Sequence, residues 1–379
     1  ALAGAIALAR VLRPGWTGQA TIGILLPPGV AGALVNYAAT LAGRTSVNLN
    51  YTGGRAGLAS AVRQAGLRSV VTSRTFLERV KLDLPDGAQP LWVETLVHRI
   101  DRGARFWAFL LALAAPLRII ERMCGMDRRP TVDDVLTVLF SSGSTGDPKG
   151  VMLTHFNVWT NVEAAAQAFP LQPTDRLVGV LPFFHSFGYM ATLWLAALHG
   201  LGVVFHPSPL EASAIGELVH RYRVTFLIAT PTFLQLYARR CTPEQFGSLR
   251  LVLTGAEKLS ERLAQAFEDR FGIRPLEGYG VTECSPVIAV SGPGFRAPGF
   301  YQRGARRGHV GQPLPGLSVR IVDPESFDPL PPGSSGMLLV KGPNVMRGYL
   351  GRDDLTAAAM RDGWYVTGDI AILDEDGFL

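Results

Sequence analysis

Hydrophobic and polar positions alternate in blocks along most of this chain. Short apolar runs rich in β-branched residues, bounded by Gly and Pro, are followed by segments with helical periodicity. The predicted strands are 21–26, 69–72, 177–181, 203–206, 225–229, 249–253 and 275–277. The predicted helices are 1–13, 30–42, 157–169, 187–199, 211–222, 232–239 and 260–271. This alternation predicts an α/β fold of parallel, helix-covered sheets, with ligands outside the carboxyl ends of the strands.

The pattern changes near residue 290. Residues 291–316 are dense in Gly, Pro and Arg, and three apolar runs without long helices follow, at 319–322, 336–341 and 364–373. Runs separated by turn clusters predict a small antiparallel barrel or sheet. We therefore expect two domains, helix-covered sheets over 1–290 and a mainly β subdomain over 291–379.

Composition excludes several classes of protein. The chain has 379 residues, of which 47% are hydrophobic and 18% charged, so it has ample material for a core. Its three cysteines are Cys124, Cys241 and Cys284, and none belongs to a C-x-x-C pair. A disulfide framework or a zinc cluster is not expected, any metal should be held by oxygen, and a reducing, cytoplasmic compartment fits.

The positive charge is local. Lys and Arg number 36 against 31 Asp and Glu, but 99–129 holds seven Arg against three acids, and 291–309 holds four Arg and no acid. The remainder of the chain is slightly acidic. We therefore expect no nucleic-acid partner.

The longest strongly apolar run, FWAFLLALAAPL at 106–117, is far shorter than the roughly 20 residues that cross a bilayer. Arginines bracket it, which predicts peripheral membrane contact by residues 102–129, at the inner face of a membrane. The alternatives are a helix buried on the large domain and a partner for a fused membrane module. Pro116 should kink or end the helix.

A phosphate loop is the strongest chemical signal. The sequence SSGSTGDPKG at 141–150 follows the apolar run 135–140. Its successive backbone N–H groups, the hydroxyls of Ser142, Ser144 and Thr145, and the Lys149 ammonium can surround a polyphosphate. The order Pro-Lys-Gly at its end excludes the Walker A loop of kinases and motors.

The same order resembles the adenylate-forming superfamily of acyl-CoA synthetases, luciferases and peptide-synthetase adenylation domains. Four further motifs match in order: LPFFHSFG (181–188), LTGAEKLS (253–260), EGYGVTECSP (277–286) and GWYVTGD (363–369). The resemblance implies ATP and Mg²⁺ as cofactors and the large N-terminal domain of that fold. The chain stops ten residues after Asp369, where the family continues into a lid that carries a lysine. Together with the missing initial Met, this leads us to expect a fragment without the C-terminal lid, and slow turnover by it alone.

The matched residues also have a chemical rationale. Glu283 offers Mg²⁺ a carboxylate oxygen, and Thr282 can donate its hydroxyl to the α-phosphate. Asp369 suits the ribose hydroxyls, and Tyr279 suits the adenine face.

The expected catalytic residues are Lys149, Thr282 and Glu283, and Glu283 is the metal ligand. The expected nucleotide-binding residues are Ser141, Ser142, Gly143, Ser144, Thr145, Gly146, Lys149, Gly255, Ala256, Glu257, Gly278, Tyr279, Gly280, Thr282 and Asp369. The resemblance further implies that Phe184, His185 and Gly278 line the acyl pocket. No base accompanies Cys284, so it is not expected to be a nucleophile.

Several stretches resemble one branch in particular, the acyl-[acyl-carrier-protein] synthetases that recycle fatty acids into phospholipid. They are GILLPP, VNLNYT, TSRTFLER, LPFFHSFG, HPSPLE, LTGAEKLSE, LEGYGVTECSP and KGPNVMRGYL. The resemblance implies activation of a long-chain fatty acid to acyl-AMP and transfer to the thiol of acyl carrier protein. The alternatives are a long-chain fatty acid–CoA ligase and a non-catalytic sensor of acyl groups or nucleotides.

Overall fold

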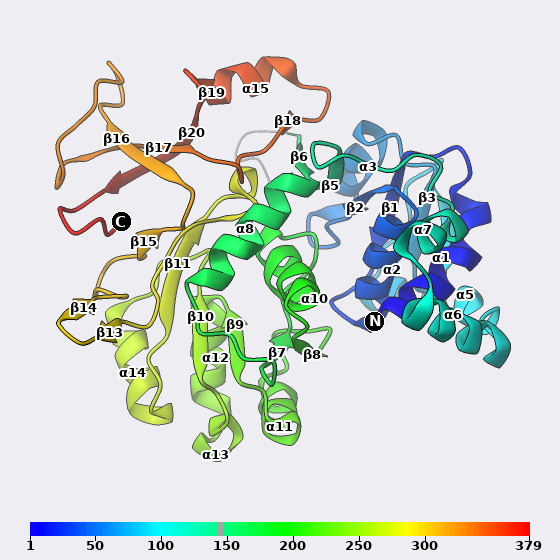
Figure 1. Cartoon of the computed structure of the whole chain (residues 1–379), viewed down its shortest axis with the longest axis horizontal. Coiled ribbons are helices and arrows are strands. Elements are labelled where there is room, and N and C mark those ends of the chain that lie inside the picture. The colour runs from blue at the N-terminus through cyan, green and yellow to red at the C-terminus, as the bar shows by residue number, and fades with distance from the viewer. Residues whose placement is uncertain (142–146) are drawn as a thin grey trace. The chain divides into compact units, whose positions relative to one another are not determined.

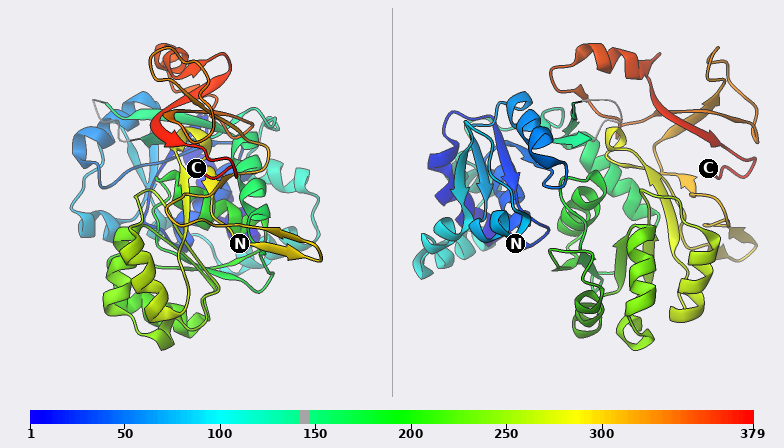
Figure 2. Two further views of the ribbon diagram at one scale, coloured as in Figure 1. Left: turned by 90° about the vertical axis from the view of Figure 1, so that its left-hand side faces the viewer. Right: turned by 180° about the vertical axis from the view of Figure 1, so that it is seen from behind.

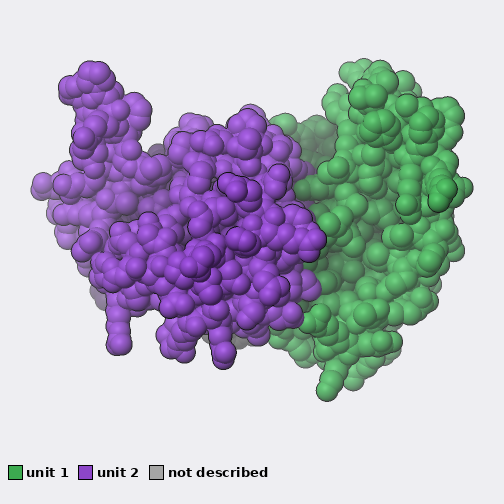
Figure 3. Space-filling model, turned by 90° about the horizontal axis from the view of Figure 1, so that it is seen from below, with its two compact units in different colours: residues 1–155, 182–185, 347–352 green, residues 156–181, 186–346, 353–379 purple. Residues whose placement is uncertain are grey.

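A computed structural model describes residues 1–141 and 147–379, and these form two compact units (Figure 3). Unit 1 consists of residues 1–155, 182–185 and 347–352. Unit 2 consists of residues 156–181, 186–346 and 353–379.

Unit 1 is built on a seven-stranded sheet with the order β18-β6-β5-β2-β1-β3-β4 (Figure 1). Strands β1 to β5 pair in parallel, and β6 and β18 add antiparallel strands at one edge. Its strands are β1 (Thr21–Leu25), β2 (Thr45–Asn48), β3 (Ser69–Thr72), β4 (Gln89–Trp92), β5 (Val135–Ser141), β6 (Lys149–Thr154) and β18 (Gly348–Tyr349). Its helices are α1 (Leu2–Trp16), α2 (Val30–Leu41), α3 (Gly54–Gln64), α4 (Arg74–Val80), α5 (Val93–His98), α6 (Arg102–Ala114) and α7 (Leu117–Cys124).

Both faces of this sheet are buried. Successive residues of a strand point to opposite faces. Thus Ile24 and Val71 pack into a core with α1, α2, α6 and α7, whereas their neighbours Leu25 and Val70 pack into a core with α3 and α4. Burial on both faces explains why these strands read as continuous apolar runs.

Unit 2 contains a second seven-stranded sheet, with the order β15-β12-β11-β10-β9-β7-β8. Strands β7 to β11 pair in parallel, and β12 and β15 are antiparallel. Its strands are β7 (Arg176–Gly179), β8 (Gly202–Phe205), β9 (Phe226–Ala229), β10 (Leu251–Thr254), β11 (Leu276–Gly280), β12 (Val287–Val290) and β15 (Gln312–Pro313). Its helices are α8 (His155–Gln167), α9 (Ser186–Gly188), the π-helical η1 (Tyr189–Leu195), α10 (Ala196–Leu198), α11 (Ala212–Tyr222), α12 (Pro231–Arg240), α13 (Pro243–Phe246), α14 (Glu261–Phe271) and the 3₁₀ turn η2 (Thr282–Cys284). Figures 1 and 2 show α11, α12 and α14 side by side.

The C-terminal part of unit 2 is the antiparallel sheet that the sequence predicts. Its strand order is β16-β17-β20-β19. The elements of this part are β16 (Ser318–Val322), β17 (Ser335–Lys341), α15 (Asp353–Ala359), β19 (Met360–Arg361) and β20 (Trp364–Ile372). Ahead of it, β13 (Phe295–Ala297) and β14 (Phe300–Gln302) form a separate two-stranded hairpin (Figure 2).

Local sequence sets several helix ends. Asp101 begins α6 by accepting a hydrogen bond from the backbone N–H of Ala104 at 2.6 Å, and Thr230 caps α12 in the same way through Phe233. Each such cap is worth about 1 kcal/mol. As predicted, Pro116 separates two helices, because its ring cannot continue α6.

The antiparallel edge strands are the main difference from the expected fold. The loop predicted at 141–150 ends earlier, because Lys149 and Gly150 pair with Ser141 and Phe140 in a β-ladder. Strand β12 was likewise not predicted, and it pairs antiparallel with β11. The helix predicted at 187–199 is present as α9, η1 and α10.

Candidate functional site

The two ends of the predicted phosphate loop meet in unit 1. Ser141 lies opposite Lys149 in the β5–β6 ladder, and the Ser141 hydroxyl donates to the Lys149 carbonyl at 3.5 Å. The Lys149 ammonium lies 5.5 Å from the ring centroid of Tyr349. The ladder therefore holds Lys149 at the base of the loop. The predicted residues Ser142, Gly143, Ser144, Thr145 and Gly146 lie outside the described residues.

The aromatic segment 182–185 also belongs to unit 1. Phe184 is buried and meets the edge of Tyr51, with ring centroids 4.8 Å apart, and Tyr51 meets Phe76 at 5.0 Å. Burial raises the pKa of Tyr51 above its usual range. His185 stacks near Phe184 at 4.7 Å and stays exposed to solvent. This cluster supplies an apolar wall with an accessible imidazole beside it.

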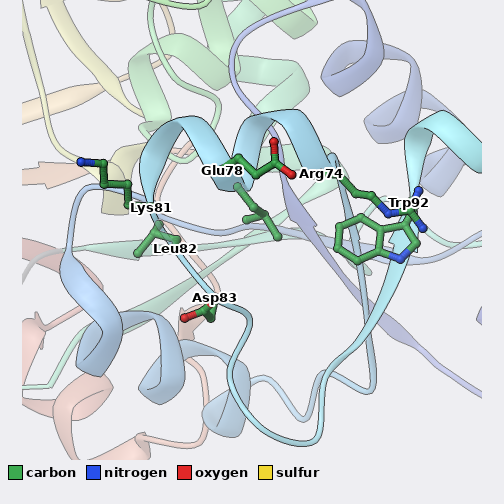
Figure 4. Close-up of a pocket in the computed structure, with 7 residues that line it drawn as sticks. Arg74, Glu78, Lys81, Leu82, Asp83 and Trp92 are labelled. Carbon is green, nitrogen blue, oxygen red and sulfur yellow. The ribbon is translucent and has the colours of Figure 1, made fainter.

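A surface hollow in unit 1 lies along α4 and contains none of the predicted site residues (Figure 4). The Arg74 guanidinium lies 4.6 Å over the Trp92 ring. Lys81, Leu82 and Asp83 line the other end, and Asp83 pairs with Arg55 at 2.7 Å. Arg74 and Asp83 are therefore each engaged with a neighbour within unit 1.

In unit 2, the predicted adenine-binding residues lie at the carboxyl ends of β10 and β11. Gly255 follows β10 directly, and a Cβ there would lie 3.0 Å from the carbonyl oxygen of Gly278, so the two backbones approach closely. Ala256 has a φ of 68°, which is rare for a residue with a side chain. The Glu257 carboxylate accepts hydrogen bonds from the hydroxyl and the backbone N–H of Thr232, at 2.6 and 3.2 Å. Glu257 is thus anchored at the first turn of α12.

Two predicted nucleotide-binding residues are bonded to each other. The Tyr279 hydroxyl donates to the Asp369 carboxylate at 2.5 Å, and the Asp369 backbone N–H donates to the Thr367 hydroxyl at 3.0 Å. Burial, assisted by the bond to Asp369, raises the pKa of Tyr279 above its usual range. The phenol therefore stays protonated and keeps donating. Sequence reasoning named both residues but not the bond between them.

The predicted catalytic pair lies on the turn η2, directly after β11. The hydroxyl of Thr282 is 3.2 Å from that of Ser186, and the backbone carbonyl of Glu283 accepts from the N–H of Met346 at 2.7 Å. Both side chains are half-buried. A Cβ at Gly280 would lie 2.1 Å from the Pro286 carbonyl oxygen, so only glycine fits ahead of this turn. The loop therefore presents a hydroxyl and a carboxylate from a tightly folded backbone.

A buried asparagine that the sequence analysis did not single out braces this turn. The Asn344 amide donates to the carbonyl of Cys284 at 2.7 Å and to that of Val287 at 3.3 Å. In return, the Ser285 hydroxyl donates to the Asn344 backbone carbonyl at 2.8 Å. Asn344 lies in the stretch KGPNVMRGYL, which the sequence analysis noted only as one of eight stretches and without a role for the asparagine.

Helix α8 adds two more buried asparagines to the same support. The Asn157 amide donates to the carbonyls of Pro343 and Val345 at 2.7 and 2.8 Å. The Asn161 amide donates to the Val287 carbonyl at 2.7 Å, and its side-chain oxygen accepts from the Val287 N–H at 3.2 Å. The segment that follows the turn η2 is therefore tied to a helix more than a hundred residues earlier in the chain.

The structure also bears on the reactivity of Cys284 and on the ligands of a bound metal. Cys284 is completely buried, and burial raises the pKa of its thiol, so it is a poor nucleophile. Among the described residues, no group of three or more His, Cys, Asp or Glu side chains could hold a metal ion. A metal held by Glu283 would therefore take its other ligands from water and substrate.

The model of the AMP-binding enzyme family matches residues 2–350. This chain belongs to that family. The resemblance to the adenylate-forming superfamily is thereby confirmed. Among its relatives, the feruloyl-CoA synthase of an Amycolatopsis species is 36% identical over 249 residues, which are 65% of this chain and 49% of that protein. The long-chain-fatty-acid–CoA ligase of Bacillus subtilis is 32% identical over 258 residues, which are 66% of this chain and 44% of that protein.

The AMP-binding enzyme fold is also found in solved structures. The o-succinylbenzoate coenzyme A synthetase of Bacillus subtilis, in complex with ATP and magnesium ion, superimposes with a TM-score of 0.80. It is 25% identical, and the match covers 99% of this chain and 72% of that one. The predicted α/β fold is confirmed. The chain spans about half the length of the curated relatives it matches.

Proposed function

We propose that this chain carries the adenylation site of an ATP-dependent acid–thiol ligase. A carboxylate oxygen of the acid attacks the α-phosphorus of ATP, the bond to pyrophosphate breaks, and acyl-AMP forms. A thiol sulfur then attacks the acyl carbon, its proton is lost to solvent, and AMP leaves. The observation that carries the proposal is the bond from Tyr279 to Asp369, because it joins two of the nucleotide motifs at one place in unit 2.

Each side chain has a proposed role that its chemistry supports. Asp369 keeps one carboxylate oxygen for the ribose hydroxyls while the other accepts from Tyr279. Thr282 directs a hydroxyl donor to the α-phosphate, and Lys149 supplies a positive charge for the phosphates. Bringing two anions together makes positioning and charge neutralisation the main sources of rate enhancement.

The residues present fit Mg²⁺. Glu283 offers a half-buried carboxylate on the 3₁₀ turn η2. It lies next to Thr282, the proposed hydrogen-bond donor to the α-phosphate. Mg²⁺ commonly binds one or two carboxylates and takes its other ligands from water and substrate phosphates. When bound, the ion would neutralise phosphate charge. Glu283 would hold it.

For the acid, we propose a long-chain fatty acid. The Bacillus subtilis relative is named a long-chain-fatty-acid–CoA ligase, and the aromatic wall of Tyr51, Phe76 and Phe184 in unit 1 suits an aliphatic chain. An aromatic acid is the competing substrate, because another relative is named a feruloyl-CoA synthase. Adenylation rates with palmitate and with ferulate, compared at equal concentration, decide between them.

For the thiol, we propose acyl carrier protein, supported by the eight stretches that resemble the carrier-protein branch. Coenzyme A is the alternative, and the names of the relatives favour it. Supplying pre-formed acyl-AMP with either thiol, and measuring acyl transfer by mass spectrometry, separates the two. We place the reaction in the cytoplasm, where the three free thiols would remain reduced.

The experiment that tests the proposed activity is acid-dependent exchange between pyrophosphate and ATP, in the protein that carries this chain. We expect exchange that requires both a fatty acid and Mg²⁺. ATP binding without exchange for any acid would contradict the proposal and favour the non-catalytic sensor.

A further inference from the structure

Helix α6 has two apolar faces, and only one is buried. Ala108 packs in the core, with Ala104, Leu111, Ala112 and Ala115 against the same cluster, and α6 lies beside α1 (Figure 1). The opposite stripe begins with Arg102 and continues with Phe106, Phe109 and Leu113, spaced four, three and four residues apart. This spacing places them on one side of the helix.

The second face is open to solvent. Phe106 is 60% exposed, Phe109 56% and Leu113 72%, and Trp107 beside them is 61% exposed. On α7, Leu117 is also half exposed. Soluble monomers rarely expose several large apolar side chains on one surface. Where such a patch occurs, it commonly marks a site of interaction with a protein or a membrane.

The charges around this face are mainly positive, apart from the exposed cap residue Asp101 at the start of α6. Arg102, Arg105, Arg118 and Arg122 are exposed, and none has an ion-pair partner among residues 1–141 and 147–379. Glu121 is the only acid between Arg102 and Cys124, and its side chain is 12% exposed and faces Arg129. The apolar stripe is thus bordered by a net positive charge.

We propose that this outer face of α6 and α7, which we call the α6–α7 face, docks on an anionic lipid bilayer. Its apolar side chains would enter the acyl boundary, and its arginines would lie among the headgroups. A second copy of the chain fits poorly, because a symmetric pairing would oppose arginine to arginine. Among the described residues no helix is long and apolar enough to span a membrane, and the proposed contact needs none.

The test is co-sedimentation of the 379-residue chain with vesicles, in the absence of ATP and acid. Vesicles of phosphatidylcholine alone are compared with vesicles that also contain phosphatidylglycerol. We expect binding only to the anionic vesicles, weakened by salt. F106S/F109S should lower the partition coefficient at least tenfold, and R118Q/R122Q about thirtyfold.

The matched control is F295S/F300S, which removes two equally exposed phenylalanines from the β13–β14 hairpin. It should leave binding unchanged, and thermal unfolding should show that all three variants fold. Equal loss in F295S/F300S and F106S/F109S, or no binding to anionic vesicles, would overturn the proposal. Binding of the wild type to a purified protein partner through this face, with no binding to vesicles, would overturn it in favour of that partner. None of these outcomes depends on adenylation, so the two proposals fail separately.

Discussion

The hydroxyl of Tyr279 donates a 2.5 Å hydrogen bond to the carboxylate of Asp369, which lies 90 residues further along the chain. The bond fixes one oxygen of the proposed ribose ligand and leaves the other available. It therefore couples the orientation of the aromatic ring to that of the carboxylate.

Removing this bond should weaken the use of ATP. In Y279F, we expect kcat/KM for ATP to fall about ten- to a hundredfold, since a hydrogen bond to a charged group contributes roughly 1.5–3 kcal/mol. D369A should lose more, because it also removes the ribose acceptor. Pyrophosphate exchange at varied ATP concentration measures both. An unchanged KM and kcat in D369A would contradict the assignment of Asp369.

Replacing the proposed metal ligand should have a larger effect. In E283A, we expect adenylation to fall at least a hundredfold, about 3 kcal/mol of lost charge stabilisation, and we expect E283Q to need more Mg²⁺. E217Q on α11 is the control, because Glu217 is exposed and belongs to the same unit. A wild-type response of E283Q to Mg²⁺ titration would refute the role of Glu283.

The hydrogen bonds of Asn344 should contribute both to the stability of the fold and to catalysis. N344A leaves the carbonyl of Cys284 without its donor, so the free energy of unfolding should fall by about 1–3 kcal/mol. If Asn344 positions Thr282 and Glu283, kcat should fall while KM for ATP changes little. A loss of stability with an unaltered kcat would reduce Asn344 to a purely structural residue.

A methyl group at Gly280 should disrupt the turn before Thr282. In G280A the new Cβ would meet the Pro286 carbonyl, which belongs to the backbone and cannot move aside cheaply. We expect a loss of several kcal/mol in the free energy of unfolding, or failure to fold. G57A in α3 is the control: its Cβ would make only an ordinary contact at 3.8 Å, and alanine favours a helix. Equal stability of the two variants would show that the turn can relax.

The three thiols should not react with a thiol reagent while the protein is folded. Burial raises the pKa of Cys124 and of Cys241 to about 11 and that of Cys284 in the same direction. Since a raised pKa keeps a thiol protonated until the pH approaches it, we expect no reaction with a disulfide reagent at about pH 8. Unfolding should expose all three. Rapid labelling of the native chain would contradict the described burial.

Much of the fold followed from periodicity. Apolar runs such as 225–229 and helices such as 260–271 were predictable, because every residue of β9 is buried and the amphipathic pattern of α14 is strong. The strand beginning at Lys149 was not, since Gly and Pro just before it resemble a loop. Its pairing depends on Ser141, across residues that carry no strand signal.

The site was predictable by residue type but not by arrangement. Motif order identified Tyr279 and Asp369, whereas the bond between them depends on folding of the whole unit. The hydrogen bonds of the supporting asparagines could not be predicted for the same reason, because Asn157 and Asn344 bond to residues far away in the sequence. The outer face of α6 could not be assigned either: a helix that is apolar on all sides does not reveal which side is covered.

The central claim is that an oxygen of the acid attacks the α-phosphorus of ATP. It is tested most directly by supplying palmitate labelled with ¹⁸O in its carboxylate, together with ATP, Mg²⁺ and a thiol acceptor, to the protein that carries this chain. The account predicts AMP that contains one ¹⁸O atom and pyrophosphate that contains none. Label in orthophosphate or in pyrophosphate, or formation of ADP in place of AMP, would contradict it.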